Sequence, residues 1–328
     1  DGQIFEEGIT EAGSLASFTA AGTAYATHGV NTIPFFIFYS MFGFQRVGDL
    51  IWAAAEMRTR GFMLGGTSGR TTLNGEGLQH QDGHSHLLAY TVPNLVTYDP
   101  AFAYEVAVIL RDGIKRMYID QEEIFYYLTV QNENYAMPEM PDGVEEGILK
   151  GMYRFRGALS GDGKTQAHLF GSGSIINEVL KAQEMLENEY GISTDVWSVT
   201  SYKQLQNEGL ETERWNMLHP GKKQKLTYVQ ECLKDTEGAY VMASDYMKAM
   251  PGSIARWFPE APITLGTDGF GRSDSRPSLR NFFEIDSRFV TLSALHALAC
   301  RGDIKAQVPQ RAMRKMEIDP EKVLPLMA

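Results

Sequence analysis

Cysteine is scarce in this chain, which has only Cys232 and Cys300 among its 328 residues. Two isolated thiols exclude a disulfide framework and are typical of a reducing compartment, so the sequence predicts a cytoplasmic location. Long apolar runs are also missing. The most apolar stretch, residues 33–44, is shorter than the roughly 18 residues that cross a bilayer. We therefore expect no membrane-spanning helix.

Positive charge is in deficit, because 30 Lys and Arg residues face 41 Asp and Glu residues, for a net charge of -11. Nucleic acid is not an expected partner, since binding to phosphates needs a basic face. A basic segment followed by an apolar one is also absent at the start, so no secretory signal is predicted. Asp1 leads almost directly into helix-like sequence, which suggests a piece of a larger protein.

Short apolar runs alternate with longer amphipathic ones along the chain, which indicates an α/β protein with mostly parallel strands. Strands are predicted at residues 33–39, 61–65, 94–97, 124–131, 166–170, 194–199, 239–244 and 263–266. Helices are predicted at residues 6–27, 42–60, 103–117, 175–190 and 287–301.

The alternation stops between Asn132 and Gly147, where Pro138 and Pro141 lie in acidic sequence that contains glycine. Such a stretch is typical of an extended linker. The sequence therefore predicts two α/β domains, residues 1–145 and 146–328. Each is expected to have a mostly parallel central sheet flanked by helices.

The segment Gly65 to His86 holds six of the 32 glycines and three of the seven histidines, and it follows a predicted strand. Long loops inside compact domains are often functional. Its histidines allow a metal site or proton transfer to a substrate, and a plain hydrogen-bonded loop also remains open. A helical H-E-x-x-H metal motif is excluded, because that pattern is absent and Gly83 interrupts the cluster.

Aromatic residues recur every third position at the first strand-to-helix junction, as Phe36, Tyr39 and Phe42. Side chains at such a junction usually belong to the core, but an open aromatic face can stack on a heteroaromatic ring. Glu11 lies in the first predicted helix and, by itself, indicates only a helix surface.

Two glycine motifs carry little functional information. The stretch at residues 171–174 (GSGS) joins a strand to a helix but lacks the full dinucleotide-binding pattern. Residues 161–163 (GDG) match the start of a thiamine diphosphate and magnesium motif, yet no Asn-Asn pair follows. We therefore predict that GDG is a turn.

Five segments together resemble one family. They are GITE (residues 8–11), IPFFIFYSMFGFQR (33–46), RTTLNGEGLQHQDGHSH (70–86), ERWNMLHP (213–220) and LGTDGFGRSDSR (265–276). The sequence is similar to the transketolase-like thiamine diphosphate enzymes, and within them to the homodimeric pyruvate dehydrogenase branch. The resemblance covers nearly the whole chain.

The resemblance implies a pyrimidine-binding domain that lacks its beginning, followed by a transketolase-like C-terminal domain. In such homodimers, each active site lies between a diphosphate domain of one subunit and a pyrimidine domain of the other. Thiamine diphosphate is the implied cofactor, with its diphosphate and Mg²⁺ held by a domain outside this chain. No metal ligand is assigned within the chain.

Roles of single residues also follow from the resemblance. Glu11 matches the family glutamate at the pyrimidine nitrogen, and Phe42 matches the aromatic residue that stacks on that ring, with Tyr39 beside it. Glu76 and His80 match polar groups around the substrate. His84 and His86 belong to the same motif, and their individual roles are left open here.

The implied reaction is oxidative decarboxylation of pyruvate with reductive acetylation of a lipoyl group. The implied partners are pyruvate, a second subunit and the lipoyl-bearing dihydrolipoamide acetyltransferase, and the chain alone is expected to be inactive. Three alternatives remain: a transketolase, a dimerisation or scaffold unit without activity, and a metal-dependent hydrolase that uses the histidines.

Overall fold

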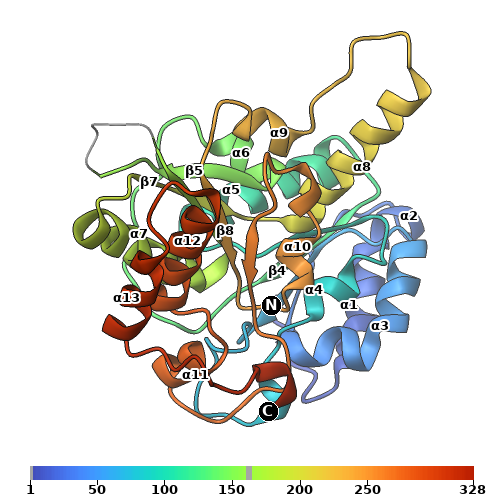
Figure 1. Cartoon of the computed structure of the whole chain (residues 1–328). Helices are drawn as coiled ribbons and strands as arrows, with labels where there is room; N and C mark the ends of the chain where they lie inside the picture. The colour runs from blue at the N-terminus through green and yellow to red at the C-terminus, as the bar shows by residue number, and fades with distance from the viewer. Residues whose placement is uncertain (1–2, 160–164) are drawn as a thin grey trace.

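The computed structural model describes residues 3–159 and 165–328 and contains two separate β-sheets with helices packed around them (Figure 1). The strands are β1 (Phe35–Tyr39), β2 (Phe62–Gly66), β3 (Leu95–Tyr98), β4 (Phe125–Thr129), β5 (Met152–Arg156), β6 (Ala167–Gly171), β7 (Thr194–Val199), β8 (Ala239–Ala243) and β9 (Ile263–Leu265). The predicted α/β class is confirmed.

The α-helices lie between these strands and after them. They are α1 (Glu11–Gly22), α2 (Ala24–Thr27), α3 (Ser40–Glu56), α4 (Ser85–Ala89), α5 (Ala103–Ile114), α6 (Glu145–Lys150), α7 (Ile176–Tyr190), α8 (Tyr202–Leu218), α9 (Tyr228–Leu233), α10 (Ala249–Gly252), α11 (Arg276–Phe282), α12 (Ser287–Arg301) and α13 (Gln307–Lys315). Short helical turns add residues 78–80, 115–119, 173–175, 255–257 and 325–327.

The first sheet has the strand order β1-β2-β4-β3, and all its pairings are parallel. Its inner strands are rich in apolar residues because helices cover both of their faces, whereas the edge strand β1 leaves Phe35 and Ile37 exposed on one face. Phe38 and Tyr127 pack toward α1 and α3, whereas Phe62 and Tyr126 pack toward α5. This sheet is the frame of the candidate site, since β1 and β2 lead directly into the segments singled out by sequence.

The second sheet has the order β5-β7-β6-β8-β9 and is parallel except for β5. Helices α7 and α12 contribute to the core on one face, and α8 and α9 to the core on the other. Strand β5 was not predicted, because Arg154 and Arg156 break its apolar pattern at the edge of the sheet.

Two predicted helix starts near the candidate site were wrong. Helix α1 begins at Glu11 and not at residue 6, because Gly8 has a left-handed φ of 71° and Thr10 caps the helix by accepting from the Gly13 N–H at 3.3 Å. Helix α3 begins at Ser40, directly after β1, and not at residue 42. As a result, Glu11 lies in the first turn of its helix.

The two sheets meet through buried polar contacts. Lys203 of α8 donates to the carbonyl oxygens of Ala89, Val92 and Leu95 at 2.9, 2.6 and 2.7 Å. Between β4 and α6, residues 130–144 form no helix or strand, as expected of a linker. The division into residues 1–145 and 146–328 stays a prediction. In the described ranges, no helix has both the length and the apolarity that crossing a membrane requires.

Candidate functional site

Two aromatic side chains lie at the carboxyl end of β1, where sheets of this kind bind ligands. Tyr39 is the last residue of the strand and is 44% exposed, and Phe42 follows in the first turn of α3. Their ring centroids are 6.0 Å apart. Phe36 instead belongs to the core, where it packs on Phe18 and Phe38. The strand therefore presents only its last aromatic residue at this end.

Glu11 reaches the same place from α1. Its Oε1 accepts a hydrogen bond from Nη1 of Arg46 at 2.8 Å, and the Arg46 guanidinium carbon lies 4.0 Å from the ring centroid of Phe42. The Glu11 side chain is 18% exposed and that of Arg46 49%. One cation thus connects the predicted carboxylate with the predicted stacking ring.

The loop after β2 adds a histidine to this aromatic pair. The His80 ring lies edge-on to Tyr39 and Phe42, with centroid distances of 5.6 and 5.1 Å. Its Nδ1 lies 3.9 Å from Oε2 of Glu76, which is too long for a hydrogen bond but close enough for an ion pair when the ring is protonated. The five residues predicted for the site are therefore connected by contacts, with Arg46 as the link.

His84 lies beside this group and contacts α3 at Gln45. Its Nε2 is 2.6 Å from Nε2 of Gln45, and its Nδ1 is 3.2 Å from Nη2 of Arg70. Burial lowers the pKa of His84, Asp82 acts in the opposite direction, and the positive charge of Arg70 lowers it further. The ring is therefore neutral near pH 7.

His86 points away from the site. It is 2% exposed, and its Nε2 lies 2.9 Å from Oγ1 of Thr129, which donates to Oδ1 of Asp99 at 2.8 Å. Burial lowers the pKa of His86 to about 4. Burial also raises the pKa of the Asp99 carboxyl to about 7. His86 thus belongs to a buried polar network and not to the exposed surface.

The rest of the loop is divided between the surface and the interface with the second sheet. Thr71 and Thr72 donate to the buried carboxylate of Asp245, each through its backbone N–H and its hydroxyl. Glu76 and His80 remain partly exposed, with side-chain exposures of 41% and 26%. The segment therefore places some of its polar side chains at the surface and others at the contact with the second sheet.

Sequence reasoning missed three residues of this site: Gln45, Arg46 and Arg70. A signal for Arg46 was available, since it follows Phe42 by four positions in a helix and must lie on the same face. No comparable signal existed for Arg70, because the carbonyl oxygens that hold it lie about 200 residues away along the chain.

The described ranges contain no arrangement of side chains suited to binding a metal ion. No group of three or more His, Cys, Asp or Glu side chains among residues 3–159 and 165–328 is placed to hold an ion. The GDG motif at residues 161–163 lies outside the described residues. The absence of a resident metal stays a prediction.

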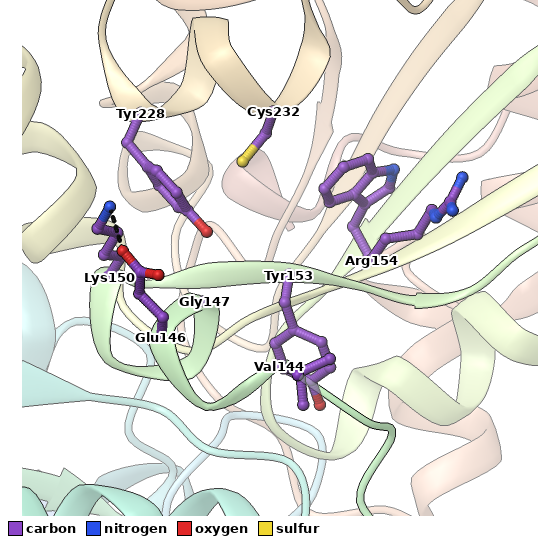
Figure 2. A pocket seen from close by; sticks show the side chains of 10 residues that line it. Val144, Glu146, Gly147, Lys150, Tyr153, Arg154, Tyr228 and Cys232 are labelled. Carbon is purple, nitrogen blue, oxygen red and sulfur yellow. Dashed lines mark ion pairs between the residues drawn. The ribbon is translucent and has the colours of Figure 1, made fainter.

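A separate open cavity of about 390 Å³ lies beside α6 and contains none of the site residues (Figure 2). Lys150 and Glu146 form an ion pair of 2.7 Å at its rim. Burial raises the pKa of the Cys232 thiol, so this sulfur is not an activated nucleophile. The cavity offers no chemistry comparable to that at the end of β1.

Two protein families match the chain. Residues 1–138 match the pyruvate dehydrogenase E1 component middle domain, and residues 151–286 match the transketolase-like TK C-terminal domain. The pyruvate dehydrogenase E1 component of Pseudomonas aeruginosa is 58% identical over 99% of this chain and 37% of its own length. The chain therefore spans little more than a third of that relative.

Solved structures show the same fold at low sequence identity. The transketolase of Campylobacter jejuni superposes with a TM-score of 0.63 and 16% identity, over 83% of this chain and 37% of that one. A split-gene transketolase described as an inactive tetramer gives a TM-score of 0.64 and 17% identity, over 89% of this chain and 83% of that one.

Proposed function

The chain belongs to the pyruvate dehydrogenase E1 component family, and we propose that it supplies the pyrimidine-binding half of a thiamine diphosphate site that decarboxylates pyruvate. One observation carries the proposal. Glu11, Phe42 and His80, which are far apart in the sequence, are joined by contacts through Arg46 at the end of β1. Each of these residue types has a task in binding or orienting the cofactor and substrate.

The residues present fit the aminopyrimidine ring of this cofactor. The Arg46 guanidinium is planar and donates hydrogen bonds, and it lies on Phe42 while donating to Glu11. A protonated pyrimidine is likewise planar and presents an N–H donor at its edge. The space between Phe42 and Glu11 therefore accepts a group of this shape and polarity once Arg46 has moved.

When bound, thiamine diphosphate supplies the electron sink for loss of carbon dioxide from a 2-keto acid. Glu11 is proposed to share a proton with the ring nitrogen through Oε1, the atom that now accepts from Arg46. Phe42 and Tyr39 orient the ring and exclude water from one of its faces. A carboxylate at this position is needed because an amide cannot accept and return that proton.

His80 and Glu76 are proposed to contact the substrate. Both are partly exposed, and His80 lies against the two aromatic rings, so a small ligand bound over Phe42 is within reach of its imidazole. An imidazole can donate to or accept from a keto or carboxylate oxygen. The preference for a short 2-keto acid such as pyruvate is carried over from the relatives named pyruvate dehydrogenase E1 component.

The remaining parts of the reaction are proposed to come from outside this chain. We expect Mg²⁺ and the diphosphate to be held by a diphosphate-binding domain and the active site to form between two subunits. We expect reductive acetylation to involve the lipoyl group of dihydrolipoamide acetyltransferase. The open face of β1 supports association, because Phe35 and Ile37 are 46% and 70% exposed there.

A scaffold role without activity is the second candidate, supported by the same apolar face and by the resemblance to the inactive split-gene tetramer. The deciding experiment uses the full-length protein with thiamine diphosphate and Mg²⁺. Release of carbon dioxide from carboxyl-labelled pyruvate is the expected result. Two-carbon transfer between sugar phosphates without pyruvate turnover would favour a transketolase, and no turnover of either substrate would favour the scaffold.

A further inference from the structure

The protonation of His84 follows from its two neighbours. Nη2 of Arg70 lies 3.2 Å from Nδ1 of His84, and a guanidinium has donors but no acceptor. Nδ1 must therefore accept and carry no proton. If the Gln45 amide also donated, both ring nitrogens would have to accept, which only an imidazolate can do. Nε2–H therefore donates to Oε1 of Gln45, with that amide turned accordingly.

Arg70 is itself held by the segment that follows β9 of the second sheet. It is 4% exposed, and its Nη1 donates to the carbonyl oxygens of Thr267 and Gly269, both at 2.5 Å. A Cβ at Gly83 would lie 2.5 Å from the guanidinium carbon, so only glycine leaves room for this group. Gly83, which interrupts the histidine cluster, is thus required because a side chain there would collide with Arg70.

Asp82 fixes the backbone at His84 through hydrogen bonds. Its Oδ1 accepts from the N–H groups of His84 and Ser85 at 3.0 and 2.9 Å, at the start of α4. The charged groups that act on the His84 ring are Asp82 and Arg70, and burial together with Arg70 outweighs Asp82, so the pKa of His84 is lowered. Position and protonation state are therefore both set by neighbours.

We propose that Arg70 is a positioning residue that holds the His84 ring in the tautomer whose Nε2–H is directed toward α3, where it donates a hydrogen bond to an oxygen of the 2-keto acid. Gln45 is the acceptor in this structure, and the substrate oxygen replaces it. The carbonyls of Thr267 and Gly269 hold Arg70, so the C-terminal part of the chain takes part in orienting the site. The identity of the acceptor rests on the proposed function, whereas the state of His84 does not.

Imidazole ¹⁵N NMR of this chain measures the state of His84 directly, with the signals assigned through His84→Asn. We expect a single neutral tautomer protonated at Nε2 and a pKa below the ordinary histidine value. Protonation at Nδ1, or an imidazolium at neutral pH, would overturn the proposal without any further variant. This measurement does not depend on catalysis.

Two substitutions at Arg70 separate its charge from its geometry. Arg70→Gln removes the charge, so the pKa of His84 should rise and both tautomers should appear. Arg70→Lys keeps the charge but cannot reach all three acceptors, so the pKa should stay low while the tautomer becomes mixed. Arg276→Gln is the matched control, since Arg276 donates to the carbonyls of Thr72 and Asn132 across the same interface and touches no histidine.

In the full-length enzyme, Arg70→Gln should lower pyruvate turnover at least about 10-fold and move the acidic limb of the pH profile to higher pH. Arg276→Gln should leave the profile in place. A changed tautomer with an unchanged profile would overturn the role in catalysis. Absence of turnover in the parent enzyme would refute the proposed function and leave the NMR result intact.

Discussion

Arg46 lies across the ring of Phe42, with its guanidinium carbon 4.0 Å from the ring centroid. The two residues are four positions apart on α3, so the helix itself brings them onto one face. Because the same guanidinium binds Glu11, it covers both groups that the pyrimidine ring would use. Any planar ligand that binds here has to displace Arg46.

Displacement of Arg46 leads to the first prediction: this chain alone binds thiamine diphosphate weakly. The expected contacts are one ring stacked on Phe42, worth roughly 0.5–1.5 kcal/mol, and one charged hydrogen bond to Glu11, worth about 1.5–3 kcal/mol. Their sum is below the roughly 8 kcal/mol of micromolar affinity. Titration calorimetry with Mg²⁺ and the cofactor measures this. Micromolar or tighter binding would reveal a diphosphate site within the chain.

Glu11→Gln in the full-length enzyme should reduce pyruvate decarboxylation by roughly 10²-fold or more, because the amide cannot share the ring proton. The fold should persist, since Glu11 makes a single side-chain contact at the surface of α1. Glu123→Gln serves as the control, because Glu123 forms a similar 2.7 Å ion pair with Arg58 away from the aromatic rings. Activity within about threefold of the parent would show that the assignment of Glu11 is wrong.

Asp99→Asn should change how stability depends on pH. Burial raises the pKa of Asp99 to about 7, so the native state keeps a proton that the unfolded chain releases near pH 4, and this stabilisation is lost as pH rises toward about 7. Asparagine resembles the neutral acid. The variant should therefore gain stability relative to the parent between about pH 4 and about pH 7.

His86 acts in the opposite direction and makes the free energy of unfolding rise with pH over the same range. Its pKa is lowered to about 4, so its contribution is complete above the unfolded value of about 6.5 and is lost as pH falls through about 4. Urea unfolding at several pH values should show a steeper rise of stability with pH in Asp99→Asn, because the opposing contribution of Asp99 is absent. Asp142→Asn, at an exposed position, should match the parent. If the free energies of unfolding of Asp99→Asn and of the parent change with pH in parallel, the raised pKa of Asp99 is contradicted.

Lys203→Met should destabilise the chain by at least about 2 kcal/mol, because three buried carbonyl oxygens lose their charged donor. Denaturant unfolding measures the change. Lys305→Met, at an exposed position, should stay within about 0.5 kcal/mol of the parent. A small effect of Lys203→Met would mean that water replaces the ammonium at this interface.

Metal analysis of the purified chain should find no stoichiometric zinc or iron. His86 faces Thr129, and His84 faces Gln45 and Arg70, so the histidines do not converge on one point. Addition of a chelator should leave the thermal unfolding temperature unchanged. A bound transition metal with histidine ligands would restore the reading of the loop as a metal site.

The sequence alone determined the fold class and most strands, because strands buried on both faces must be apolar nearly throughout. It also pointed to the segment that carries polar residues of the candidate site, since the long loop after β2 is rich in glycine and histidine. The sequence did not predict the contacts between elements that are distant along the chain. Thr267 and Gly269 hold Arg70 across almost 200 residues, and no local pattern records such a pairing.

Tertiary structure also decided which histidines face the site. His84 and His86 are two positions apart in one motif, yet one reaches α3 and the other the buried Thr129. Helix α4 begins between them, at Ser85, and each helical residue turns the chain by about 100°, so residues two apart point in nearly opposite directions. The packing of α4 against β4 then buries one ring and leaves the other beside the site.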